Sequence, residues 1–163
     1  MIVLYRVDER LIHGQVVIGW GNLLHPDRIV LVDDELAVSD WEQELYLIGL
    51  PARIEASFAT VAAARDMLRD WRENQERIVL LTRDLGTMHR LAVGGAMRGI
   101  DVNIGGIHHA PGRHAVLPYV YLSETERSHM RALADEGAKV SARDVPGARR
   151  VDLAHLLGDG SPK

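Results

Sequence analysis

The sequence contains no cysteine, which excludes disulfide bonds, thiolate nucleophiles and cysteine-based metal sites. It also lacks an apolar run of the roughly 18 residues that a transmembrane helix needs. The N-terminal segment carries the acidic residues Asp8 and Glu9 and has no secretory signal pattern. We therefore expect a cytoplasmic protein.

Positive charge is also scarce: 19 Lys and Arg stand against 23 Asp and Glu, for a net charge of −4. Such a balance gives no reason to expect nucleic acid as a partner. The length of 163 residues and the hydrophobic content of 47% predict one domain with a sizeable core. We assign this single domain to residues 1–157 and expect residues 158–163 to form a flexible tail.

Short apolar runs alternate with helical patterns along the chain. The runs that predict strands are Ile2–Val7, Arg28–Val32, Arg53–Phe58, Arg77–Thr82, Asp101–Ile104, Ala115–Leu122 and Ala138–Arg143. Helical patterns cover 16–24, 38–50, 60–72, 85–97 and a segment after Ser123. This alternation predicts an α/β fold, with an open, mostly parallel, twisted sheet of about seven strands and helices on both faces.

The predicted helices carry local start signals. Capping-box patterns occur at 39–42 and at 123–126. In the 38–50 segment, Trp41, Leu45 and Ile48 fall on one helical face. We expect Trp41, like Trp20 and Trp71, to serve core or edge packing and not to stack on a sugar.

A glycine- and histidine-rich loop from Gly105 to Arg113 interrupts the alternation, because it joins two strands without a helix. Pro118 lies inside the strand predicted after it, which suggests an edge strand or a bulge. Elsewhere, right-handed crossovers place the strand-to-helix loops at 8–13, 33–35 and 82–84 on one edge of the sheet.

The first of these loops places His13 between the end of a strand and the start of a helix, where open α/β sheets bind ligands and phosphates. A neutral imidazole, with an unperturbed pKa of about 6.5, is a nucleophile that can accept a phosphoryl group. The helix amides that begin at Gly14 and the forked guanidinium of Arg10 can hold the negative charges of that group, while Asp8 can hold the other ring N–H. The residues alone leave open an ordinary loop with a surface ion pair between Arg10 and Glu9.

The stretch Asp8–Val16 resembles the D-[DE]-R-L-I-H-G-Q-V signature of IIB subunits of the mannose/fructose/sorbose class of the bacterial phosphoenolpyruvate-dependent sugar phosphotransferase system. The resemblance extends to Arg28–Glu35 and Asn103–Gly106 and covers nearly the whole chain. It implies a single α/β domain in which His13 accepts a phosphoryl group on Nδ1 from a IIA phosphohistidine. His13 then passes the group to a sugar that enters through membrane IIC and IID subunits.

The resemblance and the local chemistry together define the expected site, which needs no cofactor. The expected catalytic residues are His13, Arg10 and Asp8, and the expected phosphate-binding residues are Arg10, Gly14, Gln15 and Arg6. A IIA partner must reach His13, so we expect an exposed, shallow depression with Arg83, His108 and His109 on its docking rim. The 81–84 and 107–114 segments depart from the usual family sequence, which leaves the sugar and partner preference open. The oligomeric state is not fixed, so a homodimer stays open.

Two clusters resemble metal sites: His108, His109 and His114 for zinc, and the acidic 33–35 segment for magnesium. Adjacent histidines point to different sides of an extended loop, and the chain has no His-Glu-x-x-His pattern, so we predict no metal site. Two alternatives stay open: a stand-alone regulatory phosphoprotein without sugar transport, and a metal-dependent hydrolase that uses the histidine loop.

Overall fold

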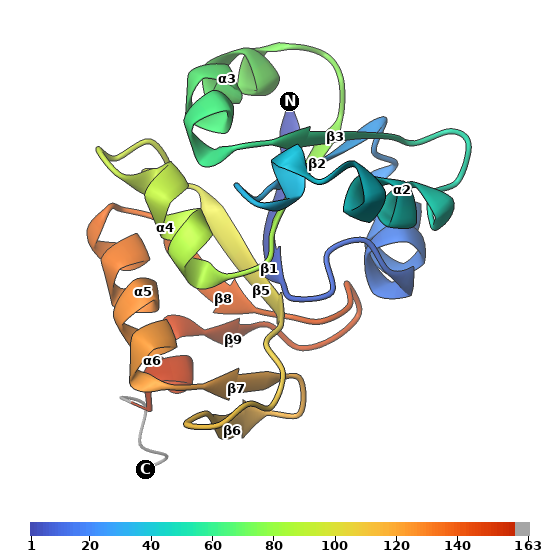
Figure 1. Cartoon of the computed structure of the whole chain (residues 1–163). Helices are drawn as coiled ribbons and strands as arrows, with labels where there is room; N and C mark the ends of the chain where they lie inside the picture. The colour runs from blue at the N-terminus through green and yellow to red at the C-terminus, as the bar shows by residue number, and fades with distance from the viewer. Residues whose placement is uncertain (159–163) are drawn as a thin grey trace.

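A computed structural model describes residues 1–158 and forms them into an α/β domain around a seven-stranded sheet (Figure 1). The strand order is β3-β2-β4-β1-β5-β8-β9, and all neighbours are parallel except β8 and β9. The bounds are β1 Ile2–Asp8, β2 Arg28–Val32, β3 Glu55–Ala59, β4 Ile78–Thr82, β5 Asp101–Gly106, β8 Lys139–Ala142 and β9 Val151–Asp152. The predicted fold class is confirmed. The predicted tail lies outside the described residues except for Gly158.

The strand predicted over 115–122 is wrong, because the chain turns there. It forms an antiparallel hairpin of β6 (His114–Leu117) and β7 (Val120–Leu122), with Pro118 in the turn between them. Proline has no backbone N–H and a fixed φ, which favours a turn over a continuous strand. The prediction missed β9, because a two-residue strand carries no readable periodicity.

The helical segments differ from expectation mainly at their ends. They are η1 Gln15–Trp20 (a π-helix), α1 Gly21–Leu24, η2 Leu36–Val38, α2 Asp40–Ile48, α3 Val61–Glu73, α4 Leu85–Ala92, α5 Glu124–Asp135 and α6 Leu153–Leu157. Helix α4 is shorter than predicted, since Gly94 and Gly95 adopt φ values of 82° and 75° that a right-handed helix does not allow. Within residues 1–158, no helix is long and apolar enough to cross a membrane.

Only one of the two predicted capping boxes forms. Ser123 and Glu126 make the reciprocal contacts at the start of α5. Ser39 makes no side-chain cap at the start of α2, so the prediction for 39–42 is wrong. The carboxylate of Glu42 instead lies 3.8 Å from Arg83, which draws it away from the helix end.

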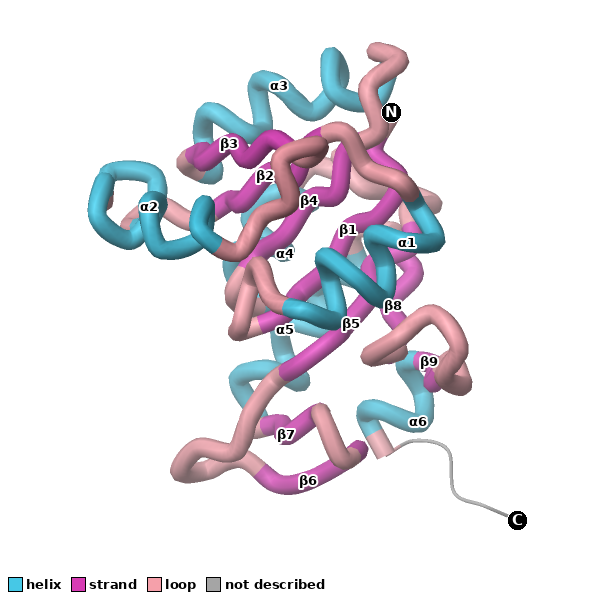
Figure 2. Tube along the Cα trace, turned by 90° about the vertical axis from the view of Figure 1, so that its right-hand side faces the viewer, coloured by secondary structure: helices cyan, strands magenta, loops and turns pink. Residues whose placement is uncertain are grey.

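Helices cover both faces of the sheet (Figure 2), and apolar side chains form two core clusters. The larger cluster joins the sheet to α3, α4, α5 and α6, and it includes Leu68, Met88 and Met130. The smaller one lies on the other face and includes Leu11 and Val16. Full burial of each such side chain contributes about 1.5–3 kcal/mol, so these clusters fix the position of the loop that carries His13.

The tryptophans do not all pack as predicted. Trp20 and Trp71 are buried, but Trp41 is 66% exposed, and Leu45 and Ile48 are exposed beside it. Helix α2 instead contacts the smaller cluster through Tyr46. Of the predicted core or edge packing, the core is therefore wrong for Trp41, because helical spacing identifies an apolar face but not the direction in which it points.

Candidate functional site

The order β2-β4-β1 brings the loops at 33–35, 82–84 and 8–13 together at one edge of the sheet. Asp33 Oδ2 lies 3.4 Å from Arg83 Nε, which joins the first two loops. On the other side of β1, Asp8 is in register with Gly106, and the Glu9 amide donates to the Gly106 carbonyl at 3.0 Å. The predicted meeting of these loops therefore occurs, and the end of β5 completes the edge.

Two apolar residues anchor the loop that presents His13. Leu11 is fully buried and has a φ of 54°, a left-handed conformation that is uncommon for a bulky residue. Its amide donates to the Asp8 carbonyl at 3.0 Å, and Ile12 is buried next to it. The carbonyl of His13 then accepts from the amides of Val16 and Val17. Burial of Leu11 and Ile12 thus holds His13 at the start of η1.

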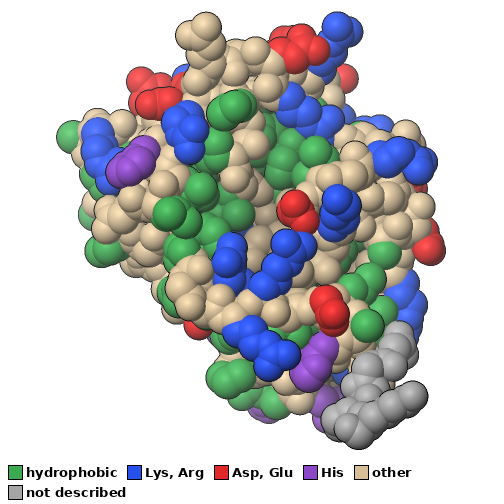
Figure 3. All heavy atoms as spheres, turned by 180° about the vertical axis from the view of Figure 1, so that it is seen from behind, with side chains coloured by type: hydrophobic (Ala, Val, Ile, Leu, Met, Phe, Trp, Pro, Cys, Tyr) green, Lys and Arg blue, Asp and Glu red, His purple; other side chains and the backbone are tan. Residues whose placement is uncertain are grey.

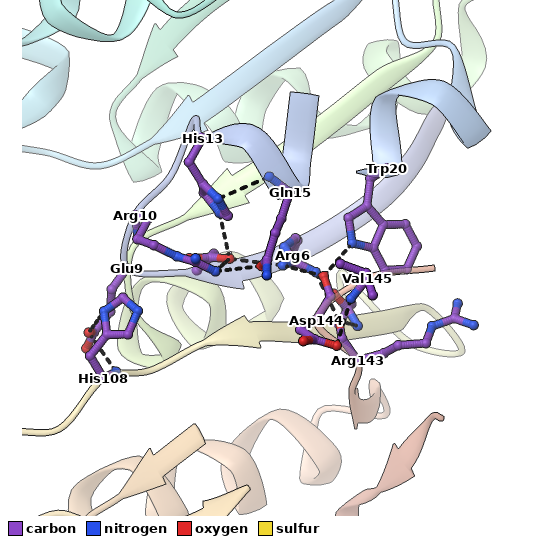
Figure 4. A network of polar contacts seen from close by, with 12 residues as sticks. Arg6, Glu9, Arg10, His13, Gln15, Trp20, His108, Arg143, Asp144 and Val145 are labelled. Carbon is purple, nitrogen blue, oxygen red and sulfur yellow. Dashed lines mark hydrogen bonds and ion pairs between the residues drawn. The ribbon is translucent and has the colours of Figure 1, made fainter. Parts of the chain in front are cut away.

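Both imidazole nitrogens of His13 have defined partners (Figure 4). Nε2 lies 3.0 Å from Asp8 Oδ2, and the Gln15 amide donates to Nδ1 at 3.3 Å. A carboxylate only accepts and an amide N–H only donates, so this pattern assigns the proton to Nε2 and the lone pair to Nδ1. The unprotonated nitrogen is therefore Nδ1, and it faces the amide of Gln15 at the start of η1. The side chain is 16% exposed.

Arg10 lies against the same carboxylate as His13 (Figure 4). Its Nε lies 3.2 Å from Asp8 Oδ1, and its Nη2 donates to Gln15 Oε1 at 2.7 Å. The side chain is 35% exposed, so the guanidinium is held in place and still reaches the surface. Gly14 is exposed, and a Cβ atom at this position would meet nothing within 4 Å. The structure thus brings His13, Arg10, Gln15 and Gly14 together.

Asp8 is the fully buried centre of this group. Burial alone would raise its pKa, but the hydrogen bond from His13, the charge of Arg6 and the hydrogen bond from Arg10 outweigh it. The pKa of Asp8 is therefore held well below its ordinary value. The carboxylate stays ionised at neutral pH, where it fixes the imidazole tautomer and can stabilise a positively charged ring.

The structure places Arg6 behind Asp8 and away from the surface. It is fully buried, its Nη2 donates to Asp8 Oδ2 at 3.0 Å, and its Nη1 donates to Asn103 Oδ1 at 2.6 Å. The same guanidinium donates to the carbonyls of Arg143 and Asp144. The predicted phosphate contact therefore has no geometric support, and we assign Arg6 to holding Asp8 in place.

Three residues at the end of β5 complete the site and were not predicted as site residues: Asn103, Gly105 and Gly106. A Cβ at Gly105 would lie 2.0 Å from the guanidinium carbon of Arg6, and one at Gly106 would lie 3.0 Å from Asp8 Oδ1. Asn103 also accepts from Arg6. The Asn-Ile-Gly-Gly segment was the only feature of the sequence that pointed to these three residues. The sequence does not show that the absence of a side chain at Gly105 leaves room for the Arg6 guanidinium.

A charged rim lies beside the site. Arg113 Nη1 donates to Glu9 Oε1 at 2.6 Å, and its Nη2 lies 3.0 Å from Glu126 Oε1. These contacts tie the His13 loop to the 107–114 loop and to α5. Glu9, Arg83, Arg113 and Glu126 line a depression of about 230 Å³.

Two of the three residues predicted for docking lie near this rim. Arg83 lines the depression and is held by Asp33 and Glu42. His108 is half exposed, with Nδ1 3.2 Å from Glu9 Oε2. His109 instead packs edge-on against the ring of Tyr121, with centroids 5.7 Å apart.

Two of the residues considered as metal ligands, His108 and Asp33, have other partners. His108 pairs with Glu9, and Asp33 accepts from the amides of Glu35 and Leu36. Over residues 1–158, no three His, Asp or Glu side chains gather in an arrangement that could hold a metal ion. A metal-dependent hydrolase would need such a set of metal-binding side chains, and residues 1–158 do not provide one.

The sequence is similar to those of known phosphotransferase proteins. The sequence model described as "PTS system sorbose subfamily IIB component" matches residues 2–162. The N-acetylgalactosamine-specific phosphotransferase enzyme IIB component 1 of Escherichia coli is 30% identical over 155 residues, which cover 93% of this chain and 96% of that protein. The mannose-specific EIIAB component of the PTS system of Escherichia coli is also 30% identical, over 96% of this chain but only 48% of that longer protein.

A solved structure gives the same fold. The IIB domain of the sorbose permease from Klebsiella pneumoniae aligns with a TM-score of 0.86 over 98% of each chain, at 23% sequence identity. Because the sequence model spans almost every residue and the E. coli relative is matched along nearly its whole length, the chain belongs to the sorbose subfamily of IIB components of the sugar phosphotransferase system.

Proposed function

We propose that His13 Nδ1 accepts a phosphoryl group from the phosphohistidine of a IIA protein. The group then passes to a sugar that enters through IIC and IID membrane subunits. The observation that carries this proposal is the pair of contacts on the imidazole: Asp8 at Nε2 and the Gln15 amide at Nδ1. They leave the lone pair on the nitrogen that faces the helix N-terminus, where negative charge is stabilised.

The first step balances without an added reactant. The bond from phosphorus to the donor imidazole breaks as the bond to His13 Nδ1 forms, and Nε2 keeps its proton. The phosphorylated ring is then cationic, and the ionised Asp8 stabilises it at 3.0 Å. The Gln15 amide no longer has a lone pair to donate to, so it becomes free to donate to a phosphoryl oxygen.

Arg10 supplies the second source of positive charge. Its guanidinium is oriented by Asp8 and by Gln15 Oε1, and its exposed part lies next to the imidazole (Figure 4). A planar guanidinium fits the oxygens of a transferring phosphoryl group and is always charged. In the second step a sugar hydroxyl oxygen attacks phosphorus, the bond to Nδ1 breaks, and the hydroxyl proton is lost to a base or to solvent.

A IIA partner is supported by the mannose-specific relative, whose name, EIIAB, joins both components in one protein. The match to this chain spans 48% of that relative.

The test is phosphorylation in a purified system. The chain is incubated with phosphoenolpyruvate, the general phosphotransferase proteins and a IIA protein, and the modified residue is mapped. We expect one adduct on His13, which is labile in acid and stable in base like a phosphoramidate, and its loss in His13→Ala with an unchanged circular dichroism spectrum. An acid-stable adduct, or labelling that persists in His13→Ala, would overturn the proposal.

A further inference from the structure

Helix α2 turns a row of large apolar side chains toward solvent. Trp41, Leu45 and Ile48 of α2 are all exposed, with Trp41 at 66% and Ile48 at 81%, and Val38 is exposed at the end of η2 just before the helix; we call these four residues the α2 surface. Spacings of four and three residues place Trp41, Leu45 and Ile48 side by side along one helical face, and Val38 lies three positions before Trp41. Contiguous exposed apolar side chains of this size typically mark a binding surface.

The fold does not require this orientation. Tyr46, on another side of α2, reaches the smaller core cluster together with Leu50 just beyond the helix, and none of the nine residues of α2 is fully buried. A surface helix normally turns its apolar face to the core and its polar face to water. The outward face of α2 is therefore available to another molecule.

The surroundings of the α2 surface are acidic. From residue 29 to residue 52 the sequence has no Lys, Arg or His and six acidic residues. Asp33 and Glu42 pair with Arg83, and Asp34 pairs with Arg90. The other three acidic side chains take part in no ion pair among residues 1–158; they are Glu35, Asp40 and Glu44. Basic side chains occur elsewhere, as the rear face shows (Figure 3).

The apolar side chains and the acidic surroundings of the α2 surface together indicate the chemistry of its partner. A surface with an apolar centre and an acidic rim fits a protein surface that offers apolar side chains among Lys and Arg. A second copy of this chain would set acid against acid, and the cytoplasmic leaflet of a membrane is itself negatively charged. The cytoplasmic loops of membrane proteins, in contrast, are enriched in Lys and Arg.

We propose that the α2 surface docks on the Lys- and Arg-rich cytoplasmic face of the membrane sugar-carrier subunits; this inference rests on the proposed function. The contacts of Arg83 connect the surface to the site. Arg83 pairs with Glu42 of α2 on one side and lines the depression with Glu9 on the other. A carrier bound to α2 would therefore have its edge beside the His13 loop, which α2 flanks in Figures 1 and 2.

The test measures sedimentation of the chain with inside-out vesicles that carry the IIC and IID subunits of its own system. Vesicles without these subunits serve as the reference. We expect Trp41→Ala/Ile48→Ser to weaken subunit-dependent binding by about tenfold or more, as loss of interface anchors does. The matched control is Leu23→Ser, at an exposed leucine of α1, and it should bind like wild type. Glu44→Lys should weaken binding at low salt only.

Phosphorylation of His13 by IIA, measured in the same samples, should be equal in all these variants. Absent labelling in the wild-type chain would reject the proposed function, whereas normal labelling with equal vesicle binding by wild type and double variant would reject the docking surface alone. The docking proposal would also fail if wild type showed no subunit-dependent binding or bound vesicles without the subunits equally well. Slower IIA transfer in the double variant, or loss of a wild-type dimer, would assign α2 to another partner and overturn it.

Discussion

At the residue scale, the buried carboxylate of Asp8 organises the chemistry of the site. It holds the imidazole of His13 through Nε2 and the guanidinium of Arg10 through Nε, and Arg6 supports it from behind. Each partner is held by a directional contact, so small changes in side-chain shape should alter transfer more than folding.

Substitution of Arg10 by Lys tests the directional part of this arrangement. Lysine keeps the positive charge but has no planar fork, so it cannot contact Asp8 and Gln15 at once as Arg10 does. We expect Arg10→Lys to fold normally and to slow phosphoryl transfer by roughly 10- to 100-fold, measured by rapid quench. Equal rates in the two proteins would show that the guanidinium does not stabilise the transferring group.

Acid should destabilise the protein through Asp8. Its folded-state pKa is depressed below the unfolded value of about 3.9, because the hydrogen bonds and charges around it outweigh burial. This group therefore stabilises the fold fully above about pH 5, and the contribution is lost as the pH falls toward the folded-state pKa. We expect the free energy of urea unfolding to fall more between about pH 5 and pH 3 in wild type than in Arg6→Met/Asp8→Asn.

The double variant is the appropriate comparison because removal of Asp8 alone leaves the buried guanidinium of Arg6 without its carboxylate partner. We expect Asp8→Asn by itself to cost about 3–5 kcal/mol, since Arg6 then lies fully buried without its ion pair. Parallel pH dependence in wild type and double variant would mean that the pair contributes nothing to acid sensitivity.

His13, Arg10 and Asp8 could be predicted as candidate site residues because they lie within six consecutive residues between a strand and a helix. It could not place Arg6, since alternation along β1 gives the side of the sheet but not the partner that lies there. The contact of Arg6 with Asn103 spans 97 positions and exists only once β1 and β5 are paired.

At the scale of elements, the end of β5 is as important as the His13 loop. Gly105 leaves the space that the Arg6 guanidinium fills, and an added Cβ would lie 2.0 Å from its central carbon. We expect Gly105→Ala to lower the free energy of urea unfolding by about 2–4 kcal/mol and to slow transfer, because Arg6 would be displaced from Asp8.

Gly147→Ala is the matched control for this change. A Cβ at Gly147 meets nothing within 4 Å, and the residue has no positive φ, so the substitution should leave stability within about 0.5 kcal/mol of wild type. If both variants unfolded at the same urea concentration as wild type, the close approach of Arg6 to β5 would not matter.

The elements themselves were predictable to different degrees. The buried strands and α3 were readable because their apolar residues follow a regular period and Thr60 caps the helix. The direction of α2 was not readable, since an apolar face gives no information on whether a core or another molecule covers it. The hairpin of β6 and β7 was concealed by one continuous apolar run with Pro118 inside it.

At the scale of the whole molecule, the rim around Arg83 is the surface that we propose for docking of the IIA partner. We expect Arg83→Glu to lower the second-order rate of phosphorylation by IIA at low salt, because it replaces a cation beside Asp33 and Glu42 with another acid. The difference should shrink as salt is added. Arg69→Glu, at an exposed arginine of α3, is the control and should have no effect. Unaltered low-salt kinetics in Arg83→Glu would exclude this rim from docking.

Leu11 is buried in a left-handed conformation next to His13, and we expect it to keep this loop rigid during phosphoryl transfer. Active-site loops that must close do so in microseconds to milliseconds and often limit turnover. Here the amides of Glu9 and Leu11 are already bonded to the Gly106 and Asp8 carbonyls, so they should exchange slowly with deuterium. The rate of phosphoryl transfer would then be limited by association and dissociation of the partner proteins. We expect this rate to fall in inverse proportion to solvent viscosity when sucrose is added.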